Sequence, residues 1–141
     1  MPVTWSLDAA AGIVRMRISD PYTFDDWLDA ITEIRSVPGI VFQRPLGSII
    51  DRAEAGPPCP QFVEAVIRFF ARSPYALRNR LLAFVLRDEP SAAAIWALIR
   101  TCEDLGAIAG VFGSAQEAEA WLREHLITSR REPDWGLRAR A

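Results

Sequence analysis

Two kinds of hydrophobic periodicity alternate along this chain, and their order limits the possible folds more than any other feature. Residues 3–7 and 13–18 alternate apolar and polar side chains on either side of a glycine-containing turn, which predicts an antiparallel hairpin. Three strand-like runs and four helix-like runs then alternate to give the order β-β-α-β-α-β-α-β-α. This order predicts a single α/β domain with a mixed, mostly parallel sheet and an antiparallel edge strand.

Capping residues mark where the predicted helices begin and end. Thr23 and Asp26 resemble a capping box before the first amphipathic run, and Ser114 and Glu117 form the same pattern before the last one. Gly106 follows the third helical run, where a left-handed cap residue is expected. A second helix is marked by apolar residues between 62 and 70, after a loop rich in glycine and proline, and is expected to end near Ser73 and Pro74. All four helices therefore have an apolar stripe that has to be covered.

The remaining strands are predicted from short apolar runs. Residues 81–86 are continuously apolar, which is typical of a strand that is buried on both faces. Residues 107–112 are interpreted as another short buried strand. The third strand is placed at residues 46–51, directly after Pro45, because proline cannot donate a hydrogen bond within a central ladder.

The composition argues against most common enzyme chemistries. All 16 basic residues are arginine, so no lysine can serve as a Schiff base, a phosphate ligand or a general base. Cys59 and Cys102 are too few and too far apart for a zinc cluster, and His125 is the only histidine. We therefore expect no metal, no cofactor and no catalytic residue, and we predict that the chain is not an enzyme.

Charge and hydropathy also limit the expected partners. The net charge of −2 provides no strong field for nucleic acid, and the apolar runs are far too short to span a membrane. The N-terminal residues carry no signal-like pattern, so a cytoplasmic location without stable membrane anchoring is expected. The domain is predicted to cover residues 1–126, and residues 127–141 form a polar, arginine-rich tail without helical periodicity.

The element order and three stretches of sequence resemble the STAS superfamily, whose members include the bacterial anti-sigma-factor antagonists. The resemblance is closest to its SpoIIAA-like branch of small bacterial proteins. The stretches are the hairpin followed by residues 23–27, the strand at 81–86 before a helix, and residues 111–122. The resemblance covers about residues 3–126. It implies a STAS-like fold and a non-enzymatic regulatory module that binds a protein partner or itself as a homodimer. Because the branch is related in fold to lipid-transfer domains, it also implies an alternative, a small apolar-ligand or lipid-binding domain.

The chain departs from this family at its regulatory site. Sigma-regulating antagonists are switched by phosphorylation of a serine or threonine at the start of the helix after the third strand. The corresponding segment here, residues 51–60, contains no hydroxyl side chain, and none occurs between Ser48 and Ser73. Phosphorylation therefore has no acceptor at this place.

Four polar residues are candidates for ligand binding because they follow predicted strands. Arg52 and Arg87 come after two strands of the expected parallel sheet, beside Asp51 and Asp88. Ligands of open α/β sheets bind beyond the carboxyl ends of the strands, so these four side chains are expected to border a small polar cleft. The alternative is that they are solvated loop charges that form weak ion pairs.

Two aromatic residues and one cysteine remain as weaker candidates. Trp96 and Phe69 lie at the edges of their predicted apolar stripes, where an exposed ring would suit a subunit interface and a covered ring would close the rim of the core. Cys59 precedes a helix and would need a base to act as a nucleophile, so an unreactive thiol is the simpler interpretation. Cys102 falls on an apolar stripe and is assigned to the core.

Overall fold

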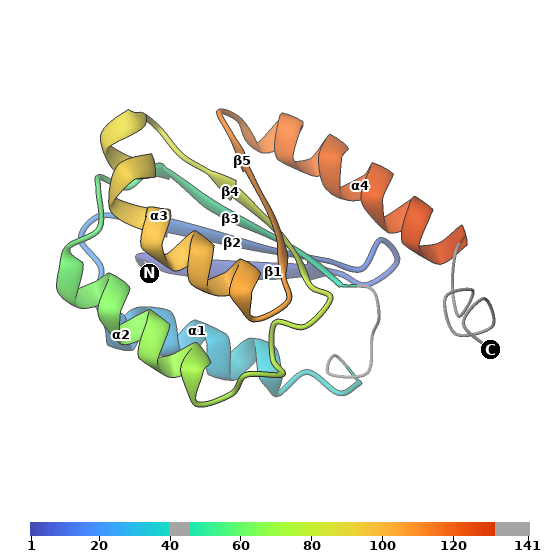
Figure 1. The fold of residues 1–141 in the computed structure, drawn as a ribbon, viewed down its shortest axis with the longest axis horizontal. Coiled ribbons are helices and arrows are strands. Elements are labelled where there is room, and N and C mark those ends of the chain that lie inside the picture. Colours follow the sequence, from blue (N-terminus) through green and yellow to red (C-terminus); the bar gives the residue numbers. More distant parts are fainter. Residues whose placement is uncertain (40–45, 132–141) are drawn as a thin grey trace.

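Residues 1–39 and 46–131 are described by the computed structural model. They form one mixed sheet of five strands in the order β1-β2-β3-β4-β5, with four helices packed on its faces (Figure 1). β1 is antiparallel to β2, and every other neighbouring pair is parallel. The strands are β1 (Val3–Asp8), β2 (Ile13–Ser19), β3 (Gly47–Glu54), β4 (Leu81–Val85) and β5 (Ile108–Phe112).

Three helices lie on one face of the sheet and the fourth lies on the other. The helices are α1 (Phe24–Arg35), α2 (Pro60–Ala71), α3 (Glu89–Asp104) and α4 (Ala115–Arg131). The connections through α1, α2 and α3 each join neighbouring parallel strands and proceed across the sheet in one direction. Because such crossovers are right-handed, these three helices have to share a face. The opposite face is left to α4, which packs on β3, β4 and β5.

The predicted hairpin, element order and helix caps are confirmed. The Thr23 hydroxyl accepts the Asp26 backbone N–H at 3.1 Å, and the Asp26 carboxylate accepts the Thr23 N–H at 2.8 Å. At the start of α4, the Ser114 hydroxyl accepts the Glu117 backbone N–H at 3.2 Å and donates to the Glu117 carboxylate at 3.2 Å. Gly106 has φ +98°, the left-handed conformation expected after α3. These short-range signals therefore set the helix boundaries that the structure shows.

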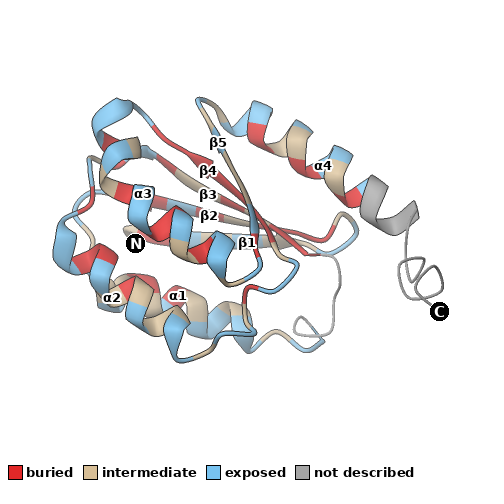
Figure 2. Ribbon diagram, viewed as in Figure 1, coloured by how far each residue is buried: buried red, intermediate tan, exposed pale blue. Residues whose placement is uncertain are grey.

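The predicted burial of β5 is wrong. Its side chains at Ile108 and Val111 are 51% and 47% exposed, whereas every residue of β4 is buried (Figure 2). β5 is the last strand of the sheet and pairs only with β4, so one of its edges has no neighbouring strand. The apolar run alone did not distinguish an edge strand from a central one.

Two boundaries also differ from the expectation. β3 continues to Glu54 instead of ending at 51, so Arg52 belongs to the strand. α4 continues to Arg131, past the predicted domain end at 126. The rest of the predicted tail, residues 132–141, and Pro45 lie outside the described residues. None of the described helices combines the length and the apolar character needed to cross a membrane.

Candidate functional site

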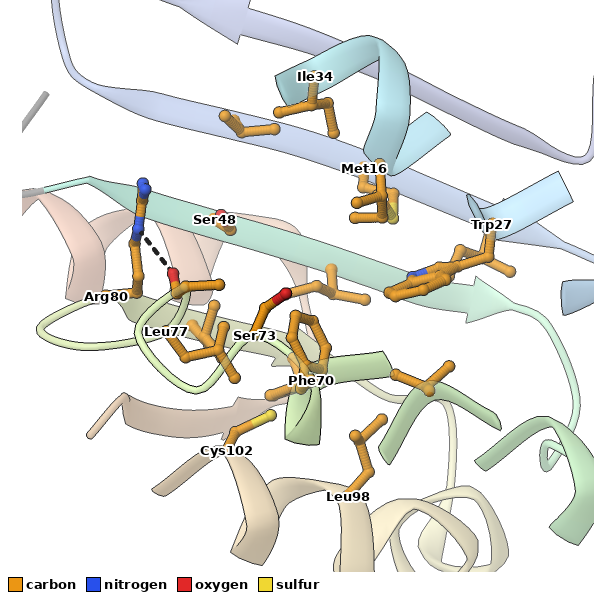
Figure 3. Close-up of a pocket in the computed structure, with 18 of the residues that line it drawn as sticks. Met16, Trp27, Ile34, Ser48, Phe70, Ser73, Leu77, Arg80, Leu98 and Cys102 are labelled. Atoms are coloured by element: carbon orange, nitrogen blue, oxygen red, sulfur yellow. Dashed lines mark hydrogen bonds between the residues drawn. The ribbon is translucent and has the colours of Figure 1, made fainter. Parts of the chain in front are cut away.

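A large apolar cavity lies between the sheet and the three helices α1, α2 and α3. Its volume is about 490 Å³. Side chains from β2, β3 and β4 form one wall and side chains from the helices form the other, so that labelled residues of both layers face the same space in Figure 3. It is larger than a second hollow of about 270 Å³ that residues of β1, β2 and β3 border.

The sheet wall follows from strand alternation. Val14, Met16 and Ile18 are alternate residues of β2, so their side chains share the face that is turned toward the helices. Ser48 and Ile50 do the same on β3. Ile50 belongs to the central strand and packs against the core, but it is only partly buried because part of its side chain borders the cavity.

The helix wall is built from residues spaced by three or four positions, which places them on one side of each helix. Trp27 of α1 packs edge-to-face against Phe62 and Phe70 of α2, with ring centroids 6.4 and 5.8 Å apart. The complete set that lines the cavity from the helices is Trp27, Ile31, Ile34, Arg35, Phe62, Val66, Phe70, Ile95, Leu98 and Cys102. The wall is therefore aromatic and aliphatic, apart from Arg35 at the end of α1 and the thiol of Cys102.

The cavity opens where α1 and α2 end and β3 begins. Arg35, the last residue of α1, and Tyr75, in the loop after α2, are exposed, and Ser73 and Arg80 are partly exposed. Arg80 lies beside the beginning of β3 in Figure 3, and its Nε donates to the Ala76 carbonyl at 3.3 Å. The mouth is therefore more polar than the interior and carries two cationic side chains.

The opposite end of the cavity is closed around Arg52. This side chain is only 1% exposed, although it carries a positive charge. Its Nη2 donates to the Tyr22 hydroxyl at 2.7 Å and to the Gly56 carbonyl at 3.0 Å, and its guanidinium lies 5.1 Å from the centroid of the Tyr22 ring. Its Nε and Nη1 are buried without a hydrogen-bond partner among the described residues.

The structure places the four candidate residues Asp51, Arg52, Arg87 and Asp88 in different surroundings. Consecutive residues of a strand point to opposite faces, so Arg52 faces the cavity while Asp51 borders a smaller hollow on the α4 side. Arg87 and Asp88 are exposed at the end of β4 and form a 3.5 Å ion pair with each other. Of the four, only Arg52 reaches the cavity.

Asp88 has a structural role as the N-cap of α3. Its carboxylate accepts the backbone N–H of Ser91 at 3.0 Å. Hydrogen bonds from Ser91 hold the pKa of the Asp88 carboxyl below its ordinary value. The Asp88 carboxylate therefore stabilises the first turn of α3.

The two aromatic interface candidates lie in different environments. Trp96 is 55% exposed on the outer side of α3, as an interface residue would be. Phe69 is partly buried, because it packs against Trp27 with a 5.3 Å centroid separation and lies beneath the guanidinium of Arg35. Phe69 therefore belongs to the aromatic cluster that closes the cavity between α1 and α2.

The thiols and the histidine do not form a catalytic group. Cys59 is exposed at the start of α2, whereas His125 lies on α4, on the other face of the sheet, where its Nδ1 is 2.9 Å from the Trp121 carbonyl oxygen. Cys102 is 2% exposed, and its burial raises the pKa of the thiol to about 12. Among residues 1–39 and 46–127, no three His, Cys, Asp or Glu side chains are grouped as metal ligands.

Alkylation is expected to distinguish the two thiols. Cys59 is exposed, so iodoacetamide should modify it in the native protein. Cys102 should remain unmodified from pH 7 to 9, because its raised pKa keeps the thiol protonated there and its burial excludes the reagent. Mass spectrometry of the native protein should show one adduct, and two after unfolding in guanidinium. Two adducts at equal rates without denaturant would contradict the packing around α3.

A cavity between the helices and the sheet was expected only under the lipid-binding alternative, and of the residues that line it only Arg52 was a predicted site residue. Its lining residues were assigned to amphipathic stripes, and a stripe that faces a cavity has the same spacing as one that faces a packed core. Only Arg52, a charge within an apolar strand, marks the cavity in the sequence. No protein-family model, curated protein or solved structure matches this chain. Its function is therefore inferred from the geometry of the cavity.

Proposed function

We propose that the chain is a non-enzymatic binding domain that holds one small apolar molecule in the cavity between the sheet and α1–α3. The cavity volume carries this proposal. At about 490 Å³ it falls within the range of roughly 300–1,000 Å³ that is typical of small-molecule pockets, and its walls are aromatic and aliphatic as such pockets require.

The shape of the cavity supports the same conclusion. Protein interiors are packed as densely as organic crystals, and voids larger than a water molecule are few. Here the space runs along β3 and has one polar mouth and one closed end, so that the part of a bound molecule between helices and sheet would be shielded from water. Burial of that apolar surface would provide the main part of the binding free energy.

A place in the SpoIIAA-like branch of the STAS superfamily is part of the proposal. That branch is related in fold to lipid-transfer domains, and the α/β architecture with one mixed sheet is compatible with this relationship. The absence of a hydroxyl side chain in residues 51–60 removes the phosphorylation switch of the sigma-regulating members. A ligand-binding role needs no such switch.

Native mass spectrometry of freshly purified protein tests the proposal. We expect additional mass on each chain that is released by collisional activation or by extraction with an organic solvent. Bare chains are expected after extraction, and these should take up the neutral dye Nile red with a stoichiometry of one. Failure of the extracted protein to bind Nile red or any other neutral apolar probe would refute the proposal.

A protein-interaction module is the second candidate function, and exposed apolar side chains favour it. Trp96 on α3 and Ile108 and Val111 on β5 are each about half exposed. Such residues suit an interface with a protein partner or with a second copy of the chain. The same mass spectra distinguish this function, because a dimer of bare chains that binds no apolar probe would support it and exclude ligand binding.

A further inference from the structure

Arg52 is a buried cation without a counter-ion in the part of the chain that the structure describes. No carboxylate there lies within ion-pairing distance of its guanidinium, and Nε and Nη1 make no hydrogen bond. Burying an arginine charge without an anionic partner is costly, and each unpaired polar group adds to that cost. Such a residue therefore suggests that an anion completes its environment.

The charges around the cavity have one sign. The charged side chains that line it within the described residues are Arg35 and Arg80 at the mouth and Arg52 at the closed end, with no aspartate or glutamate among them. An anionic ligand would therefore be attracted to the mouth and neutralised at the closed end. A cationic ligand would be repelled at both places.

The distance between the two ends sets the kind of molecule that fits. Ser48 near the mouth and Arg52 at the closed end are four residues apart on β3, which is about 13 Å along a strand. The walls between them are apolar, with Ile50, Phe70 and Leu98 facing the space. One charged group at one end of an extended hydrocarbon chain matches this arrangement.

We propose that the ligand is a medium-chain carboxylate whose head group binds Arg52 and whose hydrocarbon chain extends along β3 toward the mouth. This inference rests on the proposed function and adds the chemical class and the orientation of the ligand. The carboxylate oxygens would accept the N–H groups that the protein leaves unpaired, in charge-assisted hydrogen bonds. Because both nitrogens are covered in the empty cavity, the guanidinium has to turn toward the head group when it binds.

Competition against Nile red tests the head group on the unmodified protein. Nile red is uncharged, so it reports on the cavity without engaging Arg52 electrostatically. Decanoic acid at pH 8 is expected to displace the dye at concentrations at least about tenfold lower than decan-1-ol, which has the same chain without the charge. Equal displacement by acid and alcohol would overturn the inference while leaving the proposed function intact, and failure of Nile red to bind would refute both.

Variants locate the head group. In Arg52→Met, which keeps a long apolar side chain in an apolar site, the preference for the acid over the alcohol is expected to disappear, while alcohol binding remains. Arg52→Lys should keep part of the preference, and Arg100→Gln, which removes an exposed charge outside the cavity lining, should keep all of it. If Arg52→Met and Arg52→Lys retain the full preference and Arg35→Gln loses it, the head group lies at the mouth and the assignment to Arg52 is wrong.

Discussion

Replacing Leu122 by alanine is expected to lower the free energy of unfolding by about 3–5 kcal/mol, the upper part of the range for leucine truncations. Leu122 is fully buried between α4 and the sheet, and its side chain comes so close to the Gly47 backbone that a Cβ there would lie 3.1 Å from it. α4 is the only described helix on this face. A cavity left beneath it cannot be closed by movement of a neighbouring helix.

The cavity side of the sheet should respond less strongly. Leu98 is almost as well buried as Leu122, but its side chain already borders empty space, so truncation removes fewer packing contacts. We expect Leu98→Ala to cost about 2 kcal/mol, the lower end of the same range. Urea unfolding monitored by circular dichroism measures both differences, and the m-values of the variants should equal that of the unmodified protein.

The matched control for α4 is Ile127→Ala. Ile127 lies on the same helix and is 51% exposed, so its truncation should change the free energy of unfolding by no more than about 0.5 kcal/mol. If Leu122→Ala cost no more than Ile127→Ala, α4 would not be anchored on the sheet as the structure has it. Equal costs for Leu122→Ala and Leu98→Ala would indicate that the space beside Leu98 is filled.

The elements of this fold could be predicted because local signals define them. The alternation at Val14, Met16 and Ile18 identifies β2 and its buried face, and the capping box at Thr23 identifies the start of α1. The exposure of β5 could not be predicted in this way. Whether an apolar strand is central or at the edge depends on which strands pair with it, and that is decided by the order of the sheet and not by the strand's own residues.

The site was harder to predict than the fold, for two physical reasons. The third strand was predicted to end at residue 51, so Arg52 was interpreted as a solvated loop residue. It is a buried residue of the strand, because β3 continues to Glu54. The ends of strands are the least certain part of a sequence pattern. The cavity depends on the distance between the sheet and the helices α1–α3, and the spacing of apolar residues in the sequence does not determine that distance. Residues such as Ile50 and Leu98 have the same apolar character whether they meet another side chain or empty space.

The decisive test of the cavity is to fill it. Ile50 faces the space midway between Ser48 and Arg52, so an indole at this position would occupy the centre of the proposed ligand path. We expect Ile50→Trp to weaken Nile red binding by more than about tenfold. The free energy of unfolding should stay unchanged or rise by about 1 kcal/mol, because filling an empty space adds contacts without displacing any.

Ala97→Trp is the control for the added indole. Ala97 is exposed on α3, outside the cavity, so the same side chain there should leave dye binding and stability nearly unchanged. Undiminished dye binding in Ile50→Trp would place the probe elsewhere on the molecule. Overpacking a filled core typically costs roughly 1–3 kcal/mol. If Ile50→Trp lowered the free energy of unfolding by that amount, the helices and the sheet would be packed against each other in solution without a cavity between them. Loss of binding together with retained stability is the result that only an open cavity can produce.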